Sequence, residues 1–87
     1  MVLGAGESGV GAALLAKNKG VPVFVSDGGK ISAERKKVLL QAEIAFEEEG
    51  HDEDRVLAAA EVVKSPGIPF EVPVVRKLLA AGVPVID

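Results

Sequence analysis

Three glycines near the start of the chain have the spacing of a phosphate-binding turn. Gly4, Gly6 and Gly9 form the pattern G-x-G-x-x-G between a short apolar run and a helical stretch. In such a turn the first glycine permits the bend, the second lets the backbone approach a phosphate, and the third lets the helix pack on the strand. The N–H groups at the start of the helix then point at the anion. The pattern therefore predicts a nucleotide site, against the alternative of a tight turn that binds nothing.

An acid follows at the distance that a nucleotide site needs. Asp27 ends the second apolar run, close to the separation of about 20 residues at which a carboxylate hydrogen-bonds a bound nucleotide. In a dinucleotide site such a carboxylate accepts a hydrogen bond from a ribose hydroxyl. We therefore predict that Asp27 and the two glycines after it, Gly28 and Gly29, belong to the same site as the glycine turn.

Other polar groups have plainer explanations. The run of acids at residues 47–49 lacks a second ligand cluster, so a solvated edge or loop is favoured over a metal site. The acids at residues 52–54 suit the positive end of a helix dipole. They predict the start of a short helix rather than a pair of catalytic carboxylates. His51, the one histidine of the chain, is interpreted as a residue of a surface loop.

The elements that must position these residues alternate between apolar runs and helical stretches. We expect strands at residues 1–3, 21–25, 44–46, 61–64 and 83–86, with a helix in each interval. Such alternation predicts an α/β fold, a Rossmann-like five-stranded parallel sheet in the order 3-2-1-4-5 with helices on both faces. An unbroken β-branched run is typical of a strand buried on both faces, so Val23 and Val25 are expected to be almost fully buried.

The predicted sheet gathers the candidate residues at one edge. In that strand order the chain reverses direction between the first and the fourth strand, and ligands bind outside the carboxyl ends of the strands at such a switch point. Gly4–Gly9, Asp27–Gly29 and Ser65–Ile68 each follow a strand. We therefore expect all three segments at this edge.

Composition limits the kinds of partner. The chain has 87 residues, 48% of them hydrophobic, and a net charge of −3, and we expect a single domain over residues 1–87. Interspersed charges of that balance disfavour a nucleic-acid or membrane partner held by charge. The chain has no cysteine, which removes disulfide and thiolate chemistry. Without a signal peptide or a long apolar run, a cytoplasmic location is expected. The very short first strand and the abrupt end indicate a piece of a longer polypeptide.

The combination of these motifs resembles the N-terminal domain of the Mur ligases. The resemblance covers essentially the whole chain, and its specific part is Ser65-Pro66-Gly67-Ile68 after the fourth strand. Within the family it is greatest to the ligases that add D-glutamate. It implies a domain that holds the UDP part of a UDP-linked muramoyl substrate in peptidoglycan synthesis.

The resemblance also implies roles for individual residues. Gly6, Glu7, Ser8 and Gly9 would face the diphosphate, Asp27, Gly28 and Gly29 the uracil, and Ser65, Pro66 and Gly67 the other side of the cleft. Asp27 would accept the N3–H of uracil. Some members of the family have Thr and Arg where this chain has two glycines, so backbone N–H groups would have to serve instead. Glu7 is expected to turn its carboxylate away from the diphosphate.

The family implies further domains that this sequence does not contain. In the family a central domain binds ATP and magnesium, and a third domain helps to bind the amino acid whose amine attacks an acyl phosphate to form an amide. This chain has no G-x-x-x-x-G-K-[ST] pattern, so residues 1–87 alone are expected to bind no cofactor and to have no ligase activity. Two other functions stay open: a module that binds NAD or another adenine nucleotide, and an engineered scaffold without a function.

Overall fold

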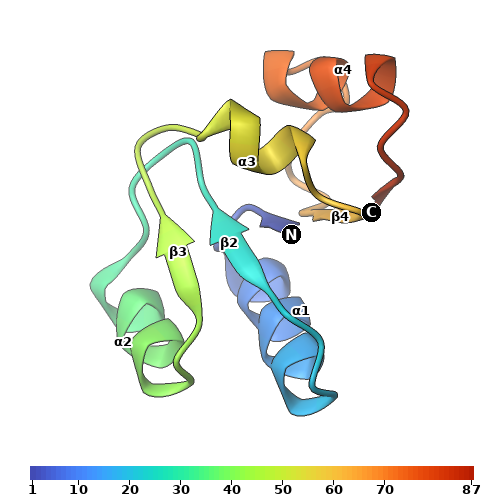
Figure 1. Ribbon diagram of the computed structural model, residues 1–87. Helices are drawn as coiled ribbons and strands as arrows, with labels where there is room; N and C mark the ends of the chain where they lie inside the picture. The colour runs from blue at the N-terminus through green and yellow to red at the C-terminus, as the bar shows by residue number, and fades with distance from the viewer.

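The computed structural model describes all 87 residues and contains one parallel sheet of five strands in the order β3-β2-β1-β4-β5. This order and the α/β fold class are those predicted from the sequence. Helices and strands alternate along the whole chain (Figure 1). In chain order the elements are β1 (Val2–Leu3), α1 (Glu7–Asn18), β2 (Phe24–Ser26), α2 (Ala33–Gln41), β3 (Ala45–Glu47), α3 (Glu53–Leu57), β4 (Val62–Lys64), α4 (Pro73–Ala80) and β5 (Val85–Ile86).

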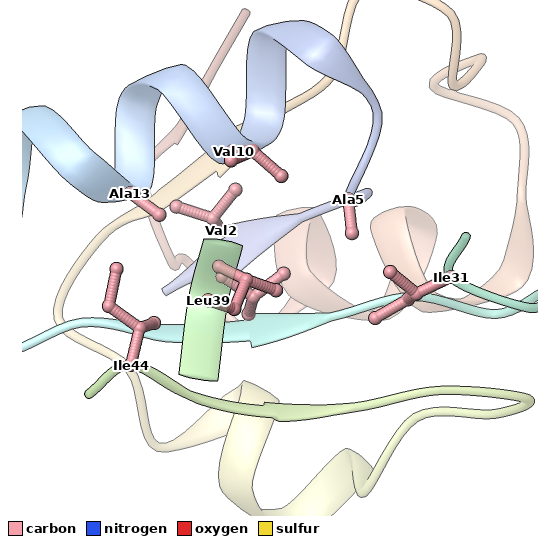
Figure 2. Close-up of a cluster of buried hydrophobic side chains, with 8 residues drawn as sticks. Val2, Ala5, Val10, Ala13, Ile31, Leu39 and Ile44 are labelled. Atoms are coloured by element: carbon pink, nitrogen blue, oxygen red, sulfur yellow. The ribbon is translucent and has the colours of Figure 1, made fainter. Parts of the chain in front are cut away.

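The sheet separates two hydrophobic cores, and the two residues of β1 face one core each. Val2 belongs to the core under α1 and α2, where Figure 2 shows Val10, Ala13 and Leu39 converging on it. Leu3 is fully buried in the core formed with α3 and α4. Successive side chains of a strand point to opposite faces, so even this short strand serves both cores. Burying one such leucine contributes roughly 1.5–3 kcal/mol to stability.

The helix pairs follow the same division. Helix α1 contacts α2, and α3 contacts α4, and the two pairs lie well apart in Figure 1. Helix α1 is followed, after its C-cap Lys19, by Gly20, whose φ of +74° is easy only for glycine. The N–H groups of Gly20 and Val21 donate to the carbonyls of Lys17 and Ala16 at 3.0 Å each. This pair of bonds satisfies two of the free carbonyls at the end of the helix.

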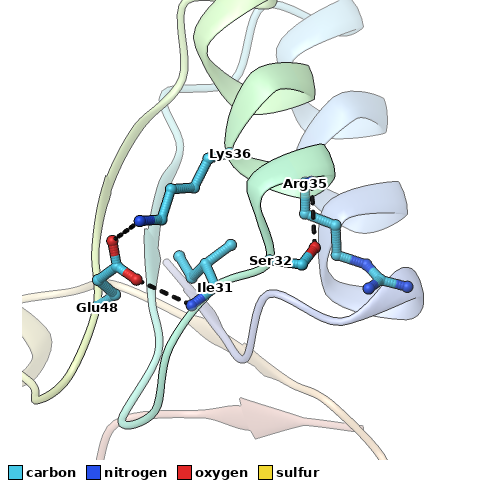
Figure 3. A network of polar contacts seen from close by, with 5 residues as sticks. All are labelled: Ile31, Ser32, Arg35, Lys36 and Glu48. Atoms are coloured by element: carbon cyan, nitrogen blue, oxygen red, sulfur yellow. Dashed lines mark hydrogen bonds and ion pairs between the residues drawn. The ribbon is translucent and has the colours of Figure 1, made fainter.

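Polar contacts fix the start of α2 (Figure 3). The Ser32 hydroxyl accepts from the N–H of Arg35 at 3.3 Å and so caps the helix; a cap of this kind contributes about 1 kcal/mol. The Glu48 carboxylate accepts from the N–H of Ile31 at 3.0 Å and forms an ion pair with Lys36. These two partners hold the pKa of Glu48 below its ordinary value, chiefly through the hydrogen bond from Lys36.

The acids at residues 47–49 lie at an edge strand and in the loop after it, as predicted, but two of them also have bonded partners. Glu48 connects the loop after β3 to the start of α2. Glu47 is the last residue of β3, is half-buried, and accepts hydrogen bonds of its own. The predicted edge or loop is where both residues lie, but the sequence did not indicate their partners in β2 and at the start of α2.

Two strand predictions also need correction. Val25 is fully buried, but Val23 is only half-buried and Val21 is 52% exposed. Residues 21–23 precede β2 for two reasons. The N–H of Val21 donates to a carbonyl of α1 rather than to a strand, and pairing with the short strand β1 begins only at Val25, opposite Val2. The last strand is shorter than expected, and Ile86 is 47% exposed, since β5 is an edge strand with a neighbour on one side only.

Candidate functional site

The glycine turn is closed by contacts that only glycine allows at its first and third positions. Gly4 has a φ of +92°, and a Cβ there would lie 3.0 Å from both Ile68 and Ser65. A Cβ on Gly9 would lie 1.8 Å from the carbonyl oxygen of Gly4. Both glycines are buried, so the fold itself explains them.

Gly6 is different, because nothing in the chain occupies the space beside it. It is the exposed N-cap residue of α1 in an extended conformation, and no atom lies within 4 Å of where its Cβ would be. The first bond of the helix runs from the N–H of Val10 to the carbonyl of Gly6 at 3.0 Å. The N–H groups of Glu7, Ser8 and Gly9 thus have no partner within the chain, as at any helix start without a side-chain cap. Free N–H groups beside open space are suited to binding an anion.

Asp27 fastens the glycine turn to the loop after β2. One carboxylate oxygen accepts from the N–H of Ala5 at 2.7 Å, and the other accepts from the N–H of Gly29 at 2.8 Å. The structure confirms that Asp27 lies beside the turn. It also shows a structural role for the carboxylate, since each oxygen already has one backbone donor; the contact with uracil stays a prediction.

The Ser65–Ile68 loop lies on the other side of the turn and is held by a buried lysine. Lys64 is only 2% exposed. Its ammonium donates to the carbonyl of Ile68 at 2.6 Å and to that of Ser65 at 3.2 Å, and it forms an ion pair with Asp87. The ring of Phe70 lies 4.5 Å from the ammonium nitrogen, within the range of a cation–π contact. Sequence reasoning treated Lys64 only as the end of a strand and missed this role.

A cleft of about 210 Å³ opens between the start of α1 and the end of β4. It lies at the switch point between β1 and β4, where a parallel sheet of this order binds its ligands. Four of the predicted site residues line it, namely Ser8, Gly9, Ser65 and Pro66. The remaining predicted residues do not line this cleft, and they are Gly6, Glu7, Asp27, Gly28, Gly29 and Gly67.

A second group lies beyond the glycine turn, where the loops after β2 and β3 are bonded to each other. The N–H of Glu49 donates to the carbonyl of Gly29 at 2.8 Å, and the N–H of Gly50 donates to that of Asp27 at 3.3 Å. The predicted residues Asp27–Gly29 belong to these paired loops. His51 lies there too, with its Nδ1 2.6 Å from the Ser26 hydroxyl. It lies in a loop, as interpreted from the sequence, but it is half-buried and its ring has a partner in β2.

The residues at or near the carboxyl ends of four neighbouring strands form one row across the sheet, and this row explains why polar groups gather at this edge. Register places Glu47 beside Ser26, Ser26 beside Leu3, and Leu3 beside Lys64. Ser26 and Lys64 are the two buried polar residues of the chain. A row of this kind could be predicted only with the register known, because its members come from four different strands.

A larger hollow, of about 570 Å³, lies at the opposite end of the strands and is lined mainly by apolar residues. It contains no residue of the glycine turn. The pKa of the Met1 ammonium at its edge is lowered because burial removes part of its hydration. The candidate site is the smaller cleft, since the free N–H groups of Ser8 and Gly9 and the switch point are there.

These features define a Rossmann-like α/β domain with a glycine turn leading into its first helix. The family model for the Mur ligase MurD-like N-terminal domain matches residues 1–87, and the chain belongs to this family. The resemblance seen in the sequence is thus confirmed.

Comparison with known proteins agrees over the full length of the chain. It is 54% identical over 87 residues to the UDP-N-acetylmuramoylalanine--D-glutamate ligase of Bacteroides thetaiotaomicron, covering 100% of this chain and 20% of that protein. The corresponding ligase of Porphyromonas gingivalis is 52% identical over 87 residues, covering 100% and 19%. The chain therefore spans about a fifth of the length of the curated relatives that it matches.

A solved structure shows the same fold. The pseudomurein peptide ligase type C from Methanothermus fervidus superposes with a TM-score of 0.81 at 22% identity, covering 99% of this chain and 18% of that one. No helix of the present chain has both the length and the apolar character needed to cross a membrane.

Proposed function

We propose that this chain binds the UDP part of a UDP-linked muramoyl substrate, as the N-terminal domain of an ATP-dependent ligase that adds D-glutamate in peptidoglycan synthesis. The observation that carries the proposal is the start of α1. Its unpartnered N–H groups lie beside the cleft of about 210 Å³ that Ser65 and Pro66 line on the other side. The identity of the proposed substrate is inferred from the family and from the names of the relatives.

The diphosphate is assigned to the glycine turn. The open space at Gly6 lets a phosphate oxygen approach the backbone, and the N–H groups of Glu7, Ser8 and Gly9 are free to donate. A helix N-terminus favours a nearby anion by about 0.3–1 kcal/mol. The Glu7 side chain is exposed, so it can extend into solvent away from the diphosphate.

The uracil is assigned to the paired loops beyond the turn. Asp27 holds the turn and the Gly28–Gly29 segment in a fixed relation through its two backbone bonds. Gly28 and Gly29 are exposed, which leaves their backbone accessible to a flat ring. The two halves of the nucleotide would thus bind on either side of one glycine turn.

ATP and magnesium are assigned to other domains of the whole ligase. The chain has no phosphate-binding lysine motif, and it holds no group of three His, Cys, Asp or Glu side chains that could ligate a metal ion. Its residues therefore do not fit ATP with Mg²⁺, and we derive no catalytic step here. The cytoplasmic location, and the absence of nucleic-acid and membrane partners, belong to the same proposal.

The experiment is an NMR titration of the ¹⁵N-labelled chain with UDP, ADP and NAD. ADP shares the diphosphate, so the comparison isolates the base. We expect UDP to bind more tightly than ADP by about tenfold, the equivalent of one hydrogen bond to a charged group at the low end of its range. The amide signals of residues 7–9 should shift with both. Equal affinity for ADP or NAD would favour the adenine-nucleotide module instead, and no binding of any of the three would refute the proposal.

A further inference from the structure

The register of the sheet places a carboxylate beside the buried lysine that holds the cleft loop. Strands β4 and β5 are parallel, with Val63 opposite Ile86, so one further step along both strands brings Lys64 opposite Asp87. Side chains alternate between the faces of a sheet. Because Val63 packs against the core under α1, Lys64 and Asp87 both belong to the other face, and they form an ion pair there.

Asp87 is the only carboxylate that forms an ion pair with this ammonium group. An ammonium has three protons to donate, and its partners are the carbonyl oxygens of Ser65 and Ile68 and the carboxylate of Asp87. The carbonyls are neutral, as is the ring of Phe70 beside the ammonium. A buried cation without a counter-charge is strongly disfavoured. Asp87 therefore allows the ammonium of Lys64 to stay both charged and buried.

The two carbonyls that Lys64 holds belong to the loop that forms one wall of the cleft. Ser65 and Pro66 line the cleft, and the N–H of Ile68 donates back to the carbonyl of Ser65 at 3.0 Å. Ser65 and Ile68 also pack against the glycine turn, since a Cβ on Gly4 would lie 3.0 Å from each of them. The position of the ammonium thus determines where this wall lies relative to the start of α1.

We propose that the Asp87 carboxylate, acting through Lys64, holds the Ser65–Ile68 loop in the position in which the cleft binds its ligand. Asp87 is thus a positioning residue, a role that rests on the proposed function and deepens it. It makes the cleft depend on β5, because Asp87 directly follows that strand. Coupling of this kind is reciprocal, so a ligand in the cleft should also hold β5 more firmly against β4. Neither residue of β5 lines the cleft, so a change in that strand reports on the coupling.

The first test compares the wild-type chain with Asp87→Asn, which keeps the shape of the side chain and removes its charge. Every protein carries a short added tail after residue 87, so that the terminal carboxylate does not replace the side chain. Binding weakens by the fraction of time that the loop is out of place. Because the lost bond joins two charged groups and the Asp87 side chain is 53% exposed, we expect calorimetry to show UDP affinity reduced about tenfold.

Two variants serve as controls for this loss. Asp87→Glu retains the charge at a half-exposed position, where a longer side chain can still reach the ammonium, and should restore UDP affinity to within about twofold of wild type. Glu53→Gln breaks an exposed ion pair with Lys77, which contacts no part of the cleft. It removes the same kind of charge and should bind UDP as wild type does.

A double-mutant cycle shows whether Asp87 acts through the lysine. In Lys64→Met the carboxylate has no ammonium left to hold, so adding Asp87→Asn should cause no further loss of UDP affinity. Amide exchange of the free proteins, followed by NMR, gives a readout that needs no ligand. The Ile68 N–H should exchange about tenfold faster in Asp87→Asn than in wild type or Glu53→Gln. Added UDP should slow amide exchange in β5 of the wild type but not of Asp87→Asn.

The possible outcomes separate this inference from the proposed function. Wild-type affinity together with wild-type loop exchange in Asp87→Asn would overturn the inference. An equal loss from Asp87→Asn in the wild-type and Lys64→Met backgrounds would do the same, because Asp87 would then act without the lysine. Tighter UDP binding by Asp87→Asn would show that the carboxylate repels the diphosphate, which also contradicts a positioning role. If the wild type binds no UDP but Asp87→Asn still speeds the exchange of Ile68, the proposed function is refuted and the positioning of the loop stands.

Discussion

Two glycines of the same turn should respond to the same substitution in opposite ways. In Gly9→Ala the new methyl group would lie 1.8 Å from the Gly4 carbonyl oxygen. It must move by about 1.2 Å to reach the 3.0 Å that real Cβ contacts respect. The obstacle is backbone rather than a flexible side chain, so no rotamer change can relieve it. Gly6→Ala meets no atom within 4 Å.

The magnitudes follow from overpacking and helix propensity. Forcing a methyl group into packed backbone costs about 1–3 kcal/mol, and the rigid obstacle places Gly9→Ala near the upper end. Alanine recovers up to about 1 kcal/mol as a better helix former. The net loss is about 2 kcal/mol, which for a domain of this size lowers the melting temperature by roughly 8–16 °C. In Gly6→Ala, alanine is a poorer N-cap than glycine, which lowers stability, and it restricts the unfolded chain, which raises stability. The two effects roughly cancel, leaving stability within about 0.5 kcal/mol of wild type.

For UDP affinity, unlike for stability, Gly6→Ala should be the more damaging of the two substitutions. The methyl group of Gly6→Ala occupies the space assigned to a phosphate oxygen, and we expect UDP affinity to fall about tenfold, or about 1.4 kcal/mol. Gly11→Ala is the control, because Gly11 is also an exposed residue of α1 with open space beside it. Urea unfolding followed by circular dichroism and UDP titration measure the two effects. A Gly9→Ala variant as stable as wild type, or a Gly6→Ala variant that binds UDP like Gly11→Ala, would refute the reasoning.

Three further substitutions test other contacts. Lys64→Met leaves two carbonyls of the Ser-Pro-Gly-Ile loop without their buried donor, and urea unfolding should show a loss of about 1–3 kcal/mol together with faster amide exchange in that loop. Asp27→Ala removes the acceptor of two backbone N–H groups, so calorimetry should show UDP affinity reduced about tenfold while ADP weakens as well. Glu48 has a lowered pKa in the folded state, so its contribution is present above the unfolded pKa and is lost as the pH falls through the folded value. Thermal unfolding at a series of pH values should find Glu48→Gln less stable than wild type at pH 7, with the difference shrinking as the pH falls below the ordinary pKa of a glutamate.

The strand order could be predicted because it depends on coarse features. Alternating apolar and helical segments select a parallel sheet, and right-handed crossovers leave few topologies. The glycine turn was predictable for the same reason: Gly4 and Gly9 are required by a local geometry that recurs in many proteins.

The roles of His51 and Lys64 could not be predicted, because they depend on partners outside any local window. Ser26 meets His51 and Glu47 only after β2 and β3 pair in register. Lys64 ends a strand, where a lysine is normally solvated, but its long side chain bends back to the carbonyls of the loop that follows. Val23 was mistaken for a core residue because β-branched composition does not show where pairing begins.

The division of the core into two clusters by the sheet has a consequence for how the domain opens. Each half has its own apolar cluster, and the halves are joined through the pairing of β1 with β2 and β4 and through the packing of Val63 and α1 across that boundary. Such an arrangement favours two partly independent cooperative units, each able to exchange its amide protons while the other stays closed. The proposed nucleotide would touch the helix of one unit and the Ser65–Gly67 loop of the other. Bound substrate would then couple the two units, and the domain would open as a single cooperative unit only when substrate is bound.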